Sequence, residues 1–256
     1  MTDPSARYPS LEDRVVFVTG GGSGIGAALV SAFHRQGARV AFVDIDEAAS
    51  RRLCREIEQE SGHAPLYQHC DVRDVDALRA ALDETVQSLG PIRTLVNNAA
   101  NDERHDWREL SVDDWNERMS LNLRPMFFAI QAVAERMAAA GGGSIINFGS
   151  ISVQNAIGNL SAYVTAKAAV HGLTRSLARD LGTQNIRVNT VVPGCILTAR
   201  QLERWIGPED EARIQEHQCL KVRLLPEHVA PAVLFLAADD SAQLTGAAIP
   251  VDGGWG

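Results

Sequence analysis

A tyrosine and a lysine, Tyr163 and Lys167, stand four positions apart and could carry acid–base chemistry. In a helix this spacing puts both side chains on one face, and Ser161 just before them can cap such a helix. An ammonium beside a phenol favours the phenolate, so Lys167 should lower the pKa of Tyr163 from about 10 toward the range in which it accepts a proton. The pair is a candidate general base, although the spacing alone favours an ordinary pair on a helix surface.

The composition gives an independent indication that Lys167 is chemically special. Of the 24 basic residues only Lys167 and Lys221 are lysines, so the chain uses arginine almost everywhere. A lysine ammonium is a compact point charge, and the planar arginine side chain does not replace it at a site that needs one. We therefore expect the ammonium of Lys167 to act in the chemistry.

A glycine-rich segment, TGGGSGIG at residues 19–26, follows a predicted strand and opens into a predicted helix. Glycines let the backbone turn tightly and approach a pyrophosphate, while the start of the helix offers free N–H groups and the positive end of its dipole. The spacing is TGxxxGxG, and the GxGxxG pattern does not fit it. The segment predicts a dinucleotide site, with contacts from Gly20, Gly22, Ser23, Gly24 and Ile25.

An acid at the end of the second predicted strand, Asp44, strengthens this signal. Its carboxylate can accept hydrogen bonds from both hydroxyls of the adenosine ribose and would repel a 2′-phosphate, and neither the glycine segment nor Ile45 offers a basic side chain. We therefore expect NAD as the cofactor, with Asp44 and Ile45 in contact with it. The alternative is that Asp44 caps the helix that starts near Glu47, a role that Asp46 could fill equally well.

The elements that must position these residues alternate between short β-branched runs and longer stretches of helical period, which is the rhythm of βαβ units. Several strand segments are apolar without alternation, as expected where helices cover both faces of a parallel sheet. We predict an α/β fold: one Rossmann-type, doubly wound sheet of seven parallel strands with helices on both faces, in a single domain of residues 1–256. The predicted strands are Val15–Thr19, Arg39–Val43, Pro65–His69, Thr94–Asn97, Ser144–Phe148, Arg187–Val192 and Ala248–Val251, and the predicted helices lie near 25–36, 47–60, 75–88, 112–139, 162–181 and 227–238.

The composition of the 256 residues excludes several classes of protein. With 45% hydrophobic and 22% charged residues, the composition is that of a globular protein. The formal net charge of −8 argues against a basic surface that would bind nucleic acids or anionic membranes. No apolar run is long enough for a signal peptide or a membrane span, so we expect a cytoplasmic protein. The four cysteines form no CxxC pair and the seven histidines show no ligand spacing, so we expect neither disulfides nor a metal.

Together these features resemble the short-chain dehydrogenase/reductase family, from about Leu11 to the end of the chain. The resemblance rests on TGGGSGIG at 19–26, Asp71 in CDV, NNAA at 97–100, Asn122 in LNL, Ser150 in INFGS, YVTAK at 163–167, PGCILT at 193–198 and a late VDGG. It implies that Tyr163 is the catalytic base, that Ser150 holds the substrate oxygen and that Lys167 binds the nicotinamide ribose. It also implies that Asn122 anchors a water molecule of a proton relay.

The same resemblance implies further contacts to the cofactor. Asp71 and Val72 would meet the adenine, Asn98 and Ala99 the adenosine side, and Ile196 and Thr198 the nicotinamide amide, with Ala100, Pro193, Gly194, Tyr163 and Lys167 also in the site. Ala100 departs from the family pattern, which usually has glycine there. The extra methyl group would tighten the cofactor loop but removes no chemical group.

The residues near the predicted base indicate a polar substrate. The candidate substrate contacts, besides Ser150 and Tyr163, are Asn101, Asp102, Ser152 and Asn155, at places where relatives acting on steroids or acyl chains usually have apolar residues. A polyhydroxylated substrate needs such donors and acceptors once it is desolvated. Asp102 is the strongest candidate, while a solvated loop position is about as good an interpretation for Glu103 and Gln154 taken singly.

The runs NNAANDERH, INFGSIS and QCLKVRLLPE resemble the bacterial NAD-dependent aldose 1-dehydrogenases, D-xylose dehydrogenases among them. This implies that Tyr163 takes the proton of the anomeric hydroxyl while hydride leaves the anomeric carbon for NAD, giving an aldonolactone. The sequence does not select the sugar, so L-arabinose, D-galactose or L-fucose could replace D-xylose.

Two rival classes stay open beside the sugar dehydrogenase. A 3-oxoacyl or steroid reductase of the same family should have an apolar substrate wall, and Asp44 together with the net charge of −8 argues against the acyl-carrier type, which would want NADP and a basic patch. A catalytically inactive, NAD-binding regulatory protein would be expected to lose Tyr163, Lys167 or Ser150, and all three are present.

The stretch 195–225 breaks the βαβ rhythm and is predicted to be a lid that orders over the sugar after NAD binds, with Pro193-Gly194 as its hinge. Trp205, on a short helix ending near Gly207, either stacks on the C–H face of a sugar while Arg200 or Gln201 reaches a hydroxyl, or packs as core under the lid. The long helical patterns favour a homotetramer, or at least a dimer. A candidate contact is the stripe of Ala132, Glu135, Arg136 and Ala139.

Overall fold

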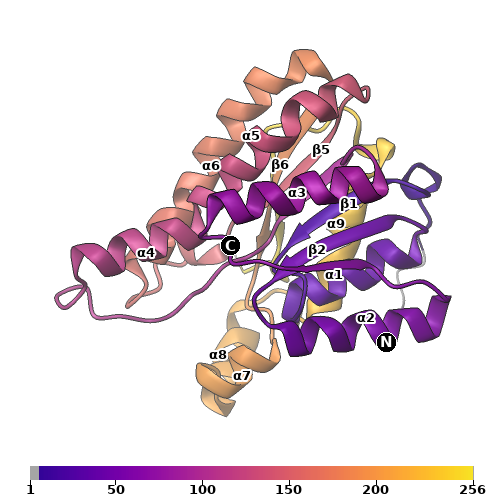
Figure 1. Ribbon diagram of the computed structural model, residues 1–256. Coiled ribbons are helices and arrows are strands. Elements are labelled where there is room, and N and C mark those ends of the chain that lie inside the picture. The colour runs from indigo at the N-terminus through magenta and orange to yellow at the C-terminus, as the bar shows by residue number, and fades with distance from the viewer. Residues whose placement is uncertain (1–5, 256) are drawn as a thin grey trace.

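The computed structural model describes residues 6–255, and within them seven parallel strands form one sheet (Figure 1). The strand order is β3-β2-β1-β4-β5-β6-β7, and every neighbouring pair runs parallel. The strands are β1 (Val15–Thr19), β2 (Arg39–Asp44), β3 (Leu66–His69), β4 (Thr94–Asn97), β5 (Gly143–Phe148), β6 (Ile186–Pro193) and β7 (Ala248–Val251). This is the predicted doubly wound α/β fold, and each predicted strand is present to within one residue at either end.

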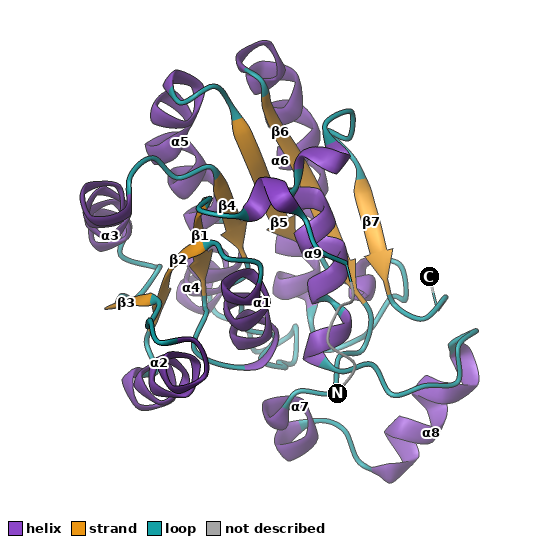
Figure 2. Cartoon of the chain, turned by 90° about the vertical axis from the view of Figure 1, so that its right-hand side faces the viewer, coloured by secondary structure: helices purple, strands orange, loops and turns teal. Residues whose placement is uncertain are grey.

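Helices cover both faces of this sheet (Figure 2). One face packs against α1 (Gly24–Arg35), α2 (Glu47–Ser61) and α9 (Ala230–Ala237), and the other against α3 (Val75–Leu89), α5 (Arg124–Ala139) and α6 (Ser161–Leu181), with α4 (Val112–Asn122) beside α5 and α6. Short 3-10 turns lie at Pro9–Leu11, Ile151–Val153, Gly182–Gln184, Pro226–His228 and Asp239–Ser241. The apolar strand sequences are explained by this double cover, because both faces of each central strand are buried.

The central strand β1 shows how one short sequence serves both cores. Val16 and Val18 belong to the cluster under α1 and α9, while Val15 and Phe17 belong to the cluster under α3 and α5. All four side chains are at most 2% exposed. Successive side chains of a strand point to opposite faces, so an unbroken apolar run is what this position in the sheet requires.

The predicted helix over 112–139 is wrong, because the chain forms two helices there that meet at Leu123. Leu123 has a φ of −135° and both caps α4 and precedes α5. Pro125 has no N–H to continue the helix and is tolerated only in a first turn, so the chain ends α4 at Asn122 and starts again. The break places Asn122 at the end of a helix, where it can face the sheet edge.

Ser161 is not the cap of α6, contrary to the prediction. Leu160 occupies the cap position and Ser161 is the first helical residue. His105 serves the helix start instead: its Nε2 lies 3.0 Å from Ser161 Oγ and accepts the backbone N–H of Ala162 at 3.4 Å. The loop after β4 is thereby joined to the helix that carries the predicted base.

The segment 195–225, which we call the lid segment, contains two helices where the sequence predicted one. These are α7 (Ala199–Arg204) and α8 (Pro208–His217), which lie apart from the helices that flank the sheet (Figure 2). A small apolar cluster of Leu197, Ile206 and Ile214 holds them together. The end of the chain is bonded to the same segment, because the N–H groups of Cys219 and Leu220 donate to the carbonyls of Gly254 and Gly253.

Candidate active site

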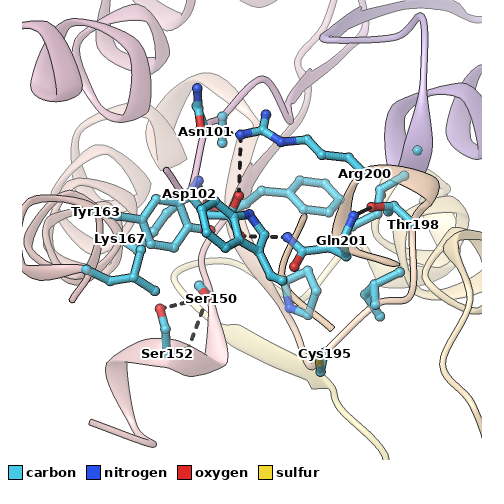
Figure 3. Close-up of a pocket in the computed structure, with 18 of the residues that line it drawn as sticks. Asn101, Asp102, Ser150, Ser152, Tyr163, Lys167, Cys195, Thr198, Arg200 and Gln201 are labelled. Atoms are coloured by element: carbon cyan, nitrogen blue, oxygen red, sulfur yellow. Dashed lines mark hydrogen bonds and ion pairs between the residues drawn. The ribbon is translucent and has the colours of Figure 1, made fainter. Parts of the chain in front are cut away.

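A cavity of about 1310 Å³ opens at the carboxyl ends of the strands, where the loops after β1 to β6 meet. In a doubly wound sheet this edge, beside the point where the strand order reverses between β1 and β4, is where ligands bind. Of the residues predicted from the sequence, all line this cavity except Gly22 and Asn122. Figure 3 shows the part that holds Ser150, Tyr163 and Asp102.

The glycine segment forms a cradle that larger residues could not form. Gly20 has a φ of +67°, and a Cβ on it would lie 2.9 Å from the backbone of Ala99. Gly24 opens α1 with a φ of +53°, and Ser23 before it makes no side-chain capping bond. The first N–H groups of α1 therefore face the cavity, as a pyrophosphate site requires. Gly22 supports the cradle from behind, since its N–H donates to Asp44 Oδ2 at 2.8 Å.

Asp44 lines the cavity at the end of β2 and does not cap the next helix. Its Oδ1 accepts the N–H of Asp46 at 2.9 Å, and Asp46 is the residue that caps α2 by accepting from Ala49 at 2.9 Å. These bonds fix the Asp44 carboxylate beside the glycine segment. It is placed where a ribose next to a bound pyrophosphate would lie.

Arg73 is a basic residue of the cavity that sequence reasoning missed. Its guanidinium is bonded twice over: Nη2 donates to Asp71 at 2.6 Å and Nη1 donates to Glu117 at 2.6 Å. The guanidinium lowers the pKa of Asp71, chiefly through this hydrogen bond. Because both neighbours are acids, Arg73 is neutralised locally, and its presence does not make the site basic.

The loop after β4 is tied to the glycine segment through Thr19. The Thr19 hydroxyl accepts the N–H groups of Asn98 at 3.0 Å and Ala99 at 3.1 Å. The Asn98 amide in turn donates to the carbonyls of Thr19 at 3.0 Å and Gly20 at 2.9 Å. Asn98 thus holds two cofactor loops together, and Ala100 lines the cavity without disturbing them.

Tyr163 and Lys167 lie on one face of α6 and both line the cavity (Figure 3). The Lys167 ammonium is 5.6 Å from the centre of the Tyr163 ring and donates to the carbonyl of Phe148 at 2.8 Å. Lys167 is only 1% exposed, although a charged side chain is rarely buried so completely. Such burial agrees with a role of the Lys167 ammonium in the chemistry of the site and differs from that of an ordinary surface lysine.

The electrostatics of this pair contradict the prediction that Lys167 lowers the pKa of Tyr163. Burial raises the pKa of Tyr163 above its usual range, and the carboxylate of Asp102 raises it further, while Ser150 and Arg200 oppose the rise. Burial also lowers the pKa of Lys167 to about 7, against the opposing influence of Asp102. The prediction is wrong because it considered only the distance between the two groups. Both side chains are buried, and the loss of hydration disfavours the charged form of each.

Ser150 is oriented by the 3-10 turn that follows it. Its Oγ accepts the N–H of Ser152 at 3.2 Å and the hydroxyl of Ser152 at 2.9 Å (Figure 3). With two bonds accepted, the hydroxyl proton of Ser150 remains free to be donated into the cavity. Ser150 can therefore hold a substrate oxygen next to Tyr163.

Asn122 lies behind the cavity wall, buried to 1% exposure. Its side-chain oxygen accepts the N–H of Asn101 at 2.8 Å and its amide donates to the carbonyl of Arg118 at 3.0 Å. The side chain therefore fixes the start of the loop 101–103, which forms one wall of the cavity.

That wall is bonded to the lid segment across about a hundred residues of sequence. Arg200 Nη2 donates to Asn101 at 2.6 Å and to Glu103 at 3.3 Å. Gln201 donates to Asp102 at 2.6 Å (Figure 3). The sequence suggested Arg200 and Gln201 as groups that reach a substrate. In the structure they contact the loop 101–103 and close the cavity from one side.

Three buried nitrogen atoms of this part of the cavity have no hydrogen-bond partner among the described residues. They are Asn155 Nδ2, Trp205 Nε1 and Arg200 Nε, and all three residues line the cavity. An N–H group buried without an acceptor costs about 1–3 kcal/mol, so such groups need an explanation. Asp102 beside them is a carboxylate that can accept. The substrate end thus presents several donors that the fold itself does not use, beside a carboxylate whose Oδ2 accepts from Gln201.

The far wall of the cavity, from α8 and the C-terminal tail, was not found by sequence reasoning. Ile214 and His217 line it from α8, and Trp255 lines it from the tail, with its ring stacked on His217 at 5.6 Å. A polar helix and a tryptophan at the chain end carried no signal that they would meet. Within residues 6–255 no group of three His, Cys, Asp or Glu side chains could hold a metal ion.

Comparison with known proteins gives consistent matches over the whole chain. A family model described as enoyl-(acyl carrier protein) reductase matches residues 20–256. A probable galactose dehydrogenase of Rhizobium meliloti is 52% identical over 99% of both chains, and a D-xylose 1-dehydrogenase of Caulobacter vibrioides is 49% identical over 98% of this chain and 99% of that one. Among solved structures, 7α-hydroxysteroid dehydrogenase complexed with NADH and a 7-oxo bile acid has a TM-score of 0.91 and 33% identity, covering 96% of each chain. A blue fluorescent protein from a metagenomic library, in complex with NADPH, has a TM-score of 0.88 and 35% identity, covering 96% of this chain and 99% of that one.

Proposed function

This chain belongs to the short-chain dehydrogenase/reductase family, and from that premise we propose that it is an NAD-dependent aldose 1-dehydrogenase that oxidises a sugar at its anomeric carbon to an aldonolactone. The observation that carries the proposal is the substrate end of the cavity. There Asp102 and the unpartnered N–H groups of Asn155 and Trp205 lie beside Ser150 and Tyr163. A ring with several hydroxyls satisfies such a wall, and a steroid or an acyl chain does not.

The relatives support the same substrate class. The two sugar dehydrogenases cited above are about half identical to this chain over nearly its full length. Their names differ in the sugar, and a pentose differs from a hexose by one hydroxymethyl group. The steroid dehydrogenase is more distant, at 33% identity. The chain also keeps Ser150, Tyr163 and Lys167 in one cavity, which argues against a catalytically inactive regulatory protein.

The cavity fits a dinucleotide, and we propose NAD over NADP. The glycine cradle and the free N–H groups at the start of α1 suit the pyrophosphate, and Asp44 suits a ribose with two free hydroxyls. A 2′-phosphate would meet the Asp44 carboxylate, and Arg73 is already paired with two acids. The residues that would hold the cofactor are Gly20, Ser23, Gly24, Ile25, Asp44, Ile45, Asp71, Val72, Asn98, Ala99, Ala100, Pro193, Gly194, Ile196 and Thr198, with Tyr163 and Lys167 at the nicotinamide end and Gly22 as support.

The bound nicotinamide supplies a hydride acceptor, and the protein supplies the proton acceptor and the alignment. Ser150 donates its free hydroxyl proton to the anomeric oxygen, because Ser152 already occupies its acceptor sites. Tyr163 accepts the proton of the anomeric hydroxyl as a phenolate. The ammonium of Lys167 lies on the same helix face, 5.6 Å from the centre of the Tyr163 ring, and would hold the nicotinamide ribose. Asn122 fixes the wall at Asn101 and would anchor the water of the proton relay.

This mechanism has a definite pH dependence. The base must be deprotonated to accept a proton, and burial together with Asp102 holds the pKa of Tyr163 above its usual range. Turnover in the oxidation direction should therefore rise from neutral to alkaline pH.

The proposal is tested by following NADH formation with D-xylose, L-arabinose, D-galactose and L-fucose, with NADP in parallel and the Tyr163→Phe variant as background. We expect turnover of at least one sugar with NAD, and trapping of the lactone by hydroxylamine identifies the product. A 7α-hydroxysteroid with NAD and a 3-oxoacyl thioester with NADH form the rival arms. Turnover of a steroid or an acyl substrate in the absence of any turnover of a sugar would overturn the proposal.

We further propose one domain with a mobile lid at 195–225, assembled as a homotetramer in the cytoplasm. Trp115 of α4 and Phe127 of α5 are 37% and 40% exposed, so these helices present apolar surface that a second copy could cover. Of the predicted stripe, Arg136 is bonded to Asp83 of α3, which leaves Ala132, Glu135 and Ala139 for the contact. Light scattering at micromolar concentration checks the mass, and a monomer contradicts the assembly.

All four cysteines lie within the described residues and are free thiols. No helix formed by residues 6–255 has the length and apolar character needed to cross a bilayer.

A further inference from the structure

Trp205 occupies the end of α7, where the lid segment meets the cavity. Its backbone N–H caps the helix by donating to Gln201 at 2.9 Å. The side chain is partly buried and lines the cavity, and its Nε1 is buried with no acceptor among residues 6–255. An indole N–H is a donor only, so no proton rearrangement can satisfy it from within.

The ring of this indole already contacts other groups of the protein. The guanidinium of Arg104 lies over the ring at 5.3 Å from its centre, within the range of a cation–π contact. The ring also packs against the apolar cluster of Leu197, Ile206 and Ile214. Stacking on a sugar would have to displace the cation, whereas a hydrogen bond from Nε1 leaves the cation in place and requires only that the atoms burying Nε1 move aside.

We infer that Trp205 is a specificity-determining residue that recognises one ring hydroxyl of the sugar through its Nε1–H and does not stack on the C–H face. The inference rests on the proposed function and deepens it: the substrate must carry an acceptor oxygen at one defined ring position. A hydroxyl fits this site because it accepts from an indole and still has a proton to donate. The Asp102 carboxylate, which lines the same cavity, can accept that proton.

The alternative that Trp205 is plain lid core has a different expectation. A core indole stabilises the lid segment through the apolar area that it buries. Replacing it by phenylalanine would weaken this packing and would change the kinetics equally with every substrate. A donor contributes one bond, so its removal matters only for substrates that carry the matching hydroxyl. A site built to hydrogen-bond a hydroxyl rejects the analogue that lacks it because its own polar group is then left unpaired.

The test combines Trp205→Phe, which keeps a ring and removes the N–H, with the best aldose of the panel and its 2-, 3- and 4-deoxy analogues. We expect Trp205→Phe to lower kcat/KM about ten- to a hundredfold on the parent sugar, mainly through KM for the sugar, with KM for NAD unchanged. With one of the deoxy analogues, the wild type should show the same decrease in kcat/KM relative to the parent sugar. With that analogue, Trp205→Phe should cause no further decrease in kcat/KM. Melting temperatures of both proteins establish that the variant is folded.

The matched control is Trp255→Phe, which removes the other cavity indole, one that stacks on His217 and whose Nε1 is not among the buried unpartnered atoms. Its effect should be the same on the parent and on every analogue. An equal loss for Trp205→Phe on all sugars, or wild-type kinetics on the parent, would overturn the inference while leaving the proposed function standing. Absence of turnover on every aldose would instead overturn the proposed function, and the inference with it.

Discussion

Replacing Lys167 by methionine should make the free enzyme more stable at pH 6 and no more stable at pH 10. Burial lowers the pKa of Lys167 from 10.5 to about 7. At about 1.36 kcal/mol for each pKa unit, this difference destabilises the fold by at most about 5 kcal/mol at a pH where both the folded and the unfolded chain are protonated. Methionine has a similar length and no charge, so it removes that cost.

The substitution also leaves the carbonyl of Phe148 without the donor that Lys167 supplies at 2.8 Å. An acceptor buried without its partner costs about 1–3 kcal/mol. The net expectation is that Lys167→Met is about 2–4 kcal/mol more stable than wild type at pH 6. Between pH 7 and 10.5 the unfolded wild-type chain holds the proton that the folded chain has lost, so wild-type stability rises and the advantage of the variant disappears. At pH 10 the variant should equal the wild type or be about 2 kcal/mol less stable.

Urea titration followed by tryptophan fluorescence, without NAD, measures these free energies of unfolding. Lys167→Arg is the matched variant, because arginine keeps its proton throughout this pH range. The free energy of unfolding of Lys167→Arg should fall further below that of the wild type by up to about 4 kcal/mol from pH 6 to pH 10, because only the wild type gains stability there. Both variants should lose turnover. A difference between Lys167→Met and wild type that is the same at pH 6 and pH 10 would refute the assignment of a buried, easily deprotonated ammonium.

Three further substitutions test the site. Tyr163→Phe should lower kcat at least a hundredfold and leave NAD affinity within about twofold, measured by fluorescence titration, because it removes only the proton acceptor; a tenth of the wild-type rate would exclude Tyr163 as the base. Asp44→Ala should bring the ratio of kcat/KM for NAD over NADP from about tenfold or more toward one, since the repulsive carboxylate is gone; an unchanged ratio removes Asp44 from cofactor choice. Asp102→Asn should shift the alkaline rise of kcat to lower pH, because the Asp102 carboxylate raises the pKa of Tyr163; an unmoved profile with only a raised KM for sugar would leave Asp102 as a binding residue.

The fold and most of the cavity follow from short-range sequence signals. The strands are short runs of four to eight residues, rich in β-branched residues except in β3, and the glycine segment follows directly after the first of them. Asp44 and Tyr163 stand at element ends that a parallel sheet gathers at one edge. One exception among the helices is the break at Leu123, where the apolar period continues through Pro125 although Pro125 has no N–H to donate. The other is α8, the second helix of the lid segment.

Contacts between distant segments could not be predicted in the same way. Glu103 accepts from Arg200 at 3.3 Å and from Arg204 at 2.8 Å, about a hundred positions later, and nothing in either segment specifies the other. Trp255 meets His217 only because the chain end pairs with residues 219 and 220. The direction of the pKa of Tyr163 was missed for a related reason: the spacing of Tyr163 and Lys167 sets their distance, while burial, which the whole fold decides, sets their charge.

The two lysines show why a composition signal can be sound and still be incomplete. Lys167 is buried in the cavity, as its rarity suggested, but Lys221 is exposed and its ammonium donates to the carbonyls of Gln215, Glu216 and Gln218 at 2.9, 2.9 and 2.6 Å. The last carbonyls of a helix lack partners and carry its negative dipole end, and one compact ammonium with three donors serves three of them together. Both lysines therefore stand where a small cation meets carbonyl oxygens, one inside the cavity and one at the end of α8, the helix that forms its far wall. What distinguishes the catalytic candidate from the structural one is burial beside Tyr163, and that is a property of the fold, which the count of lysines does not contain.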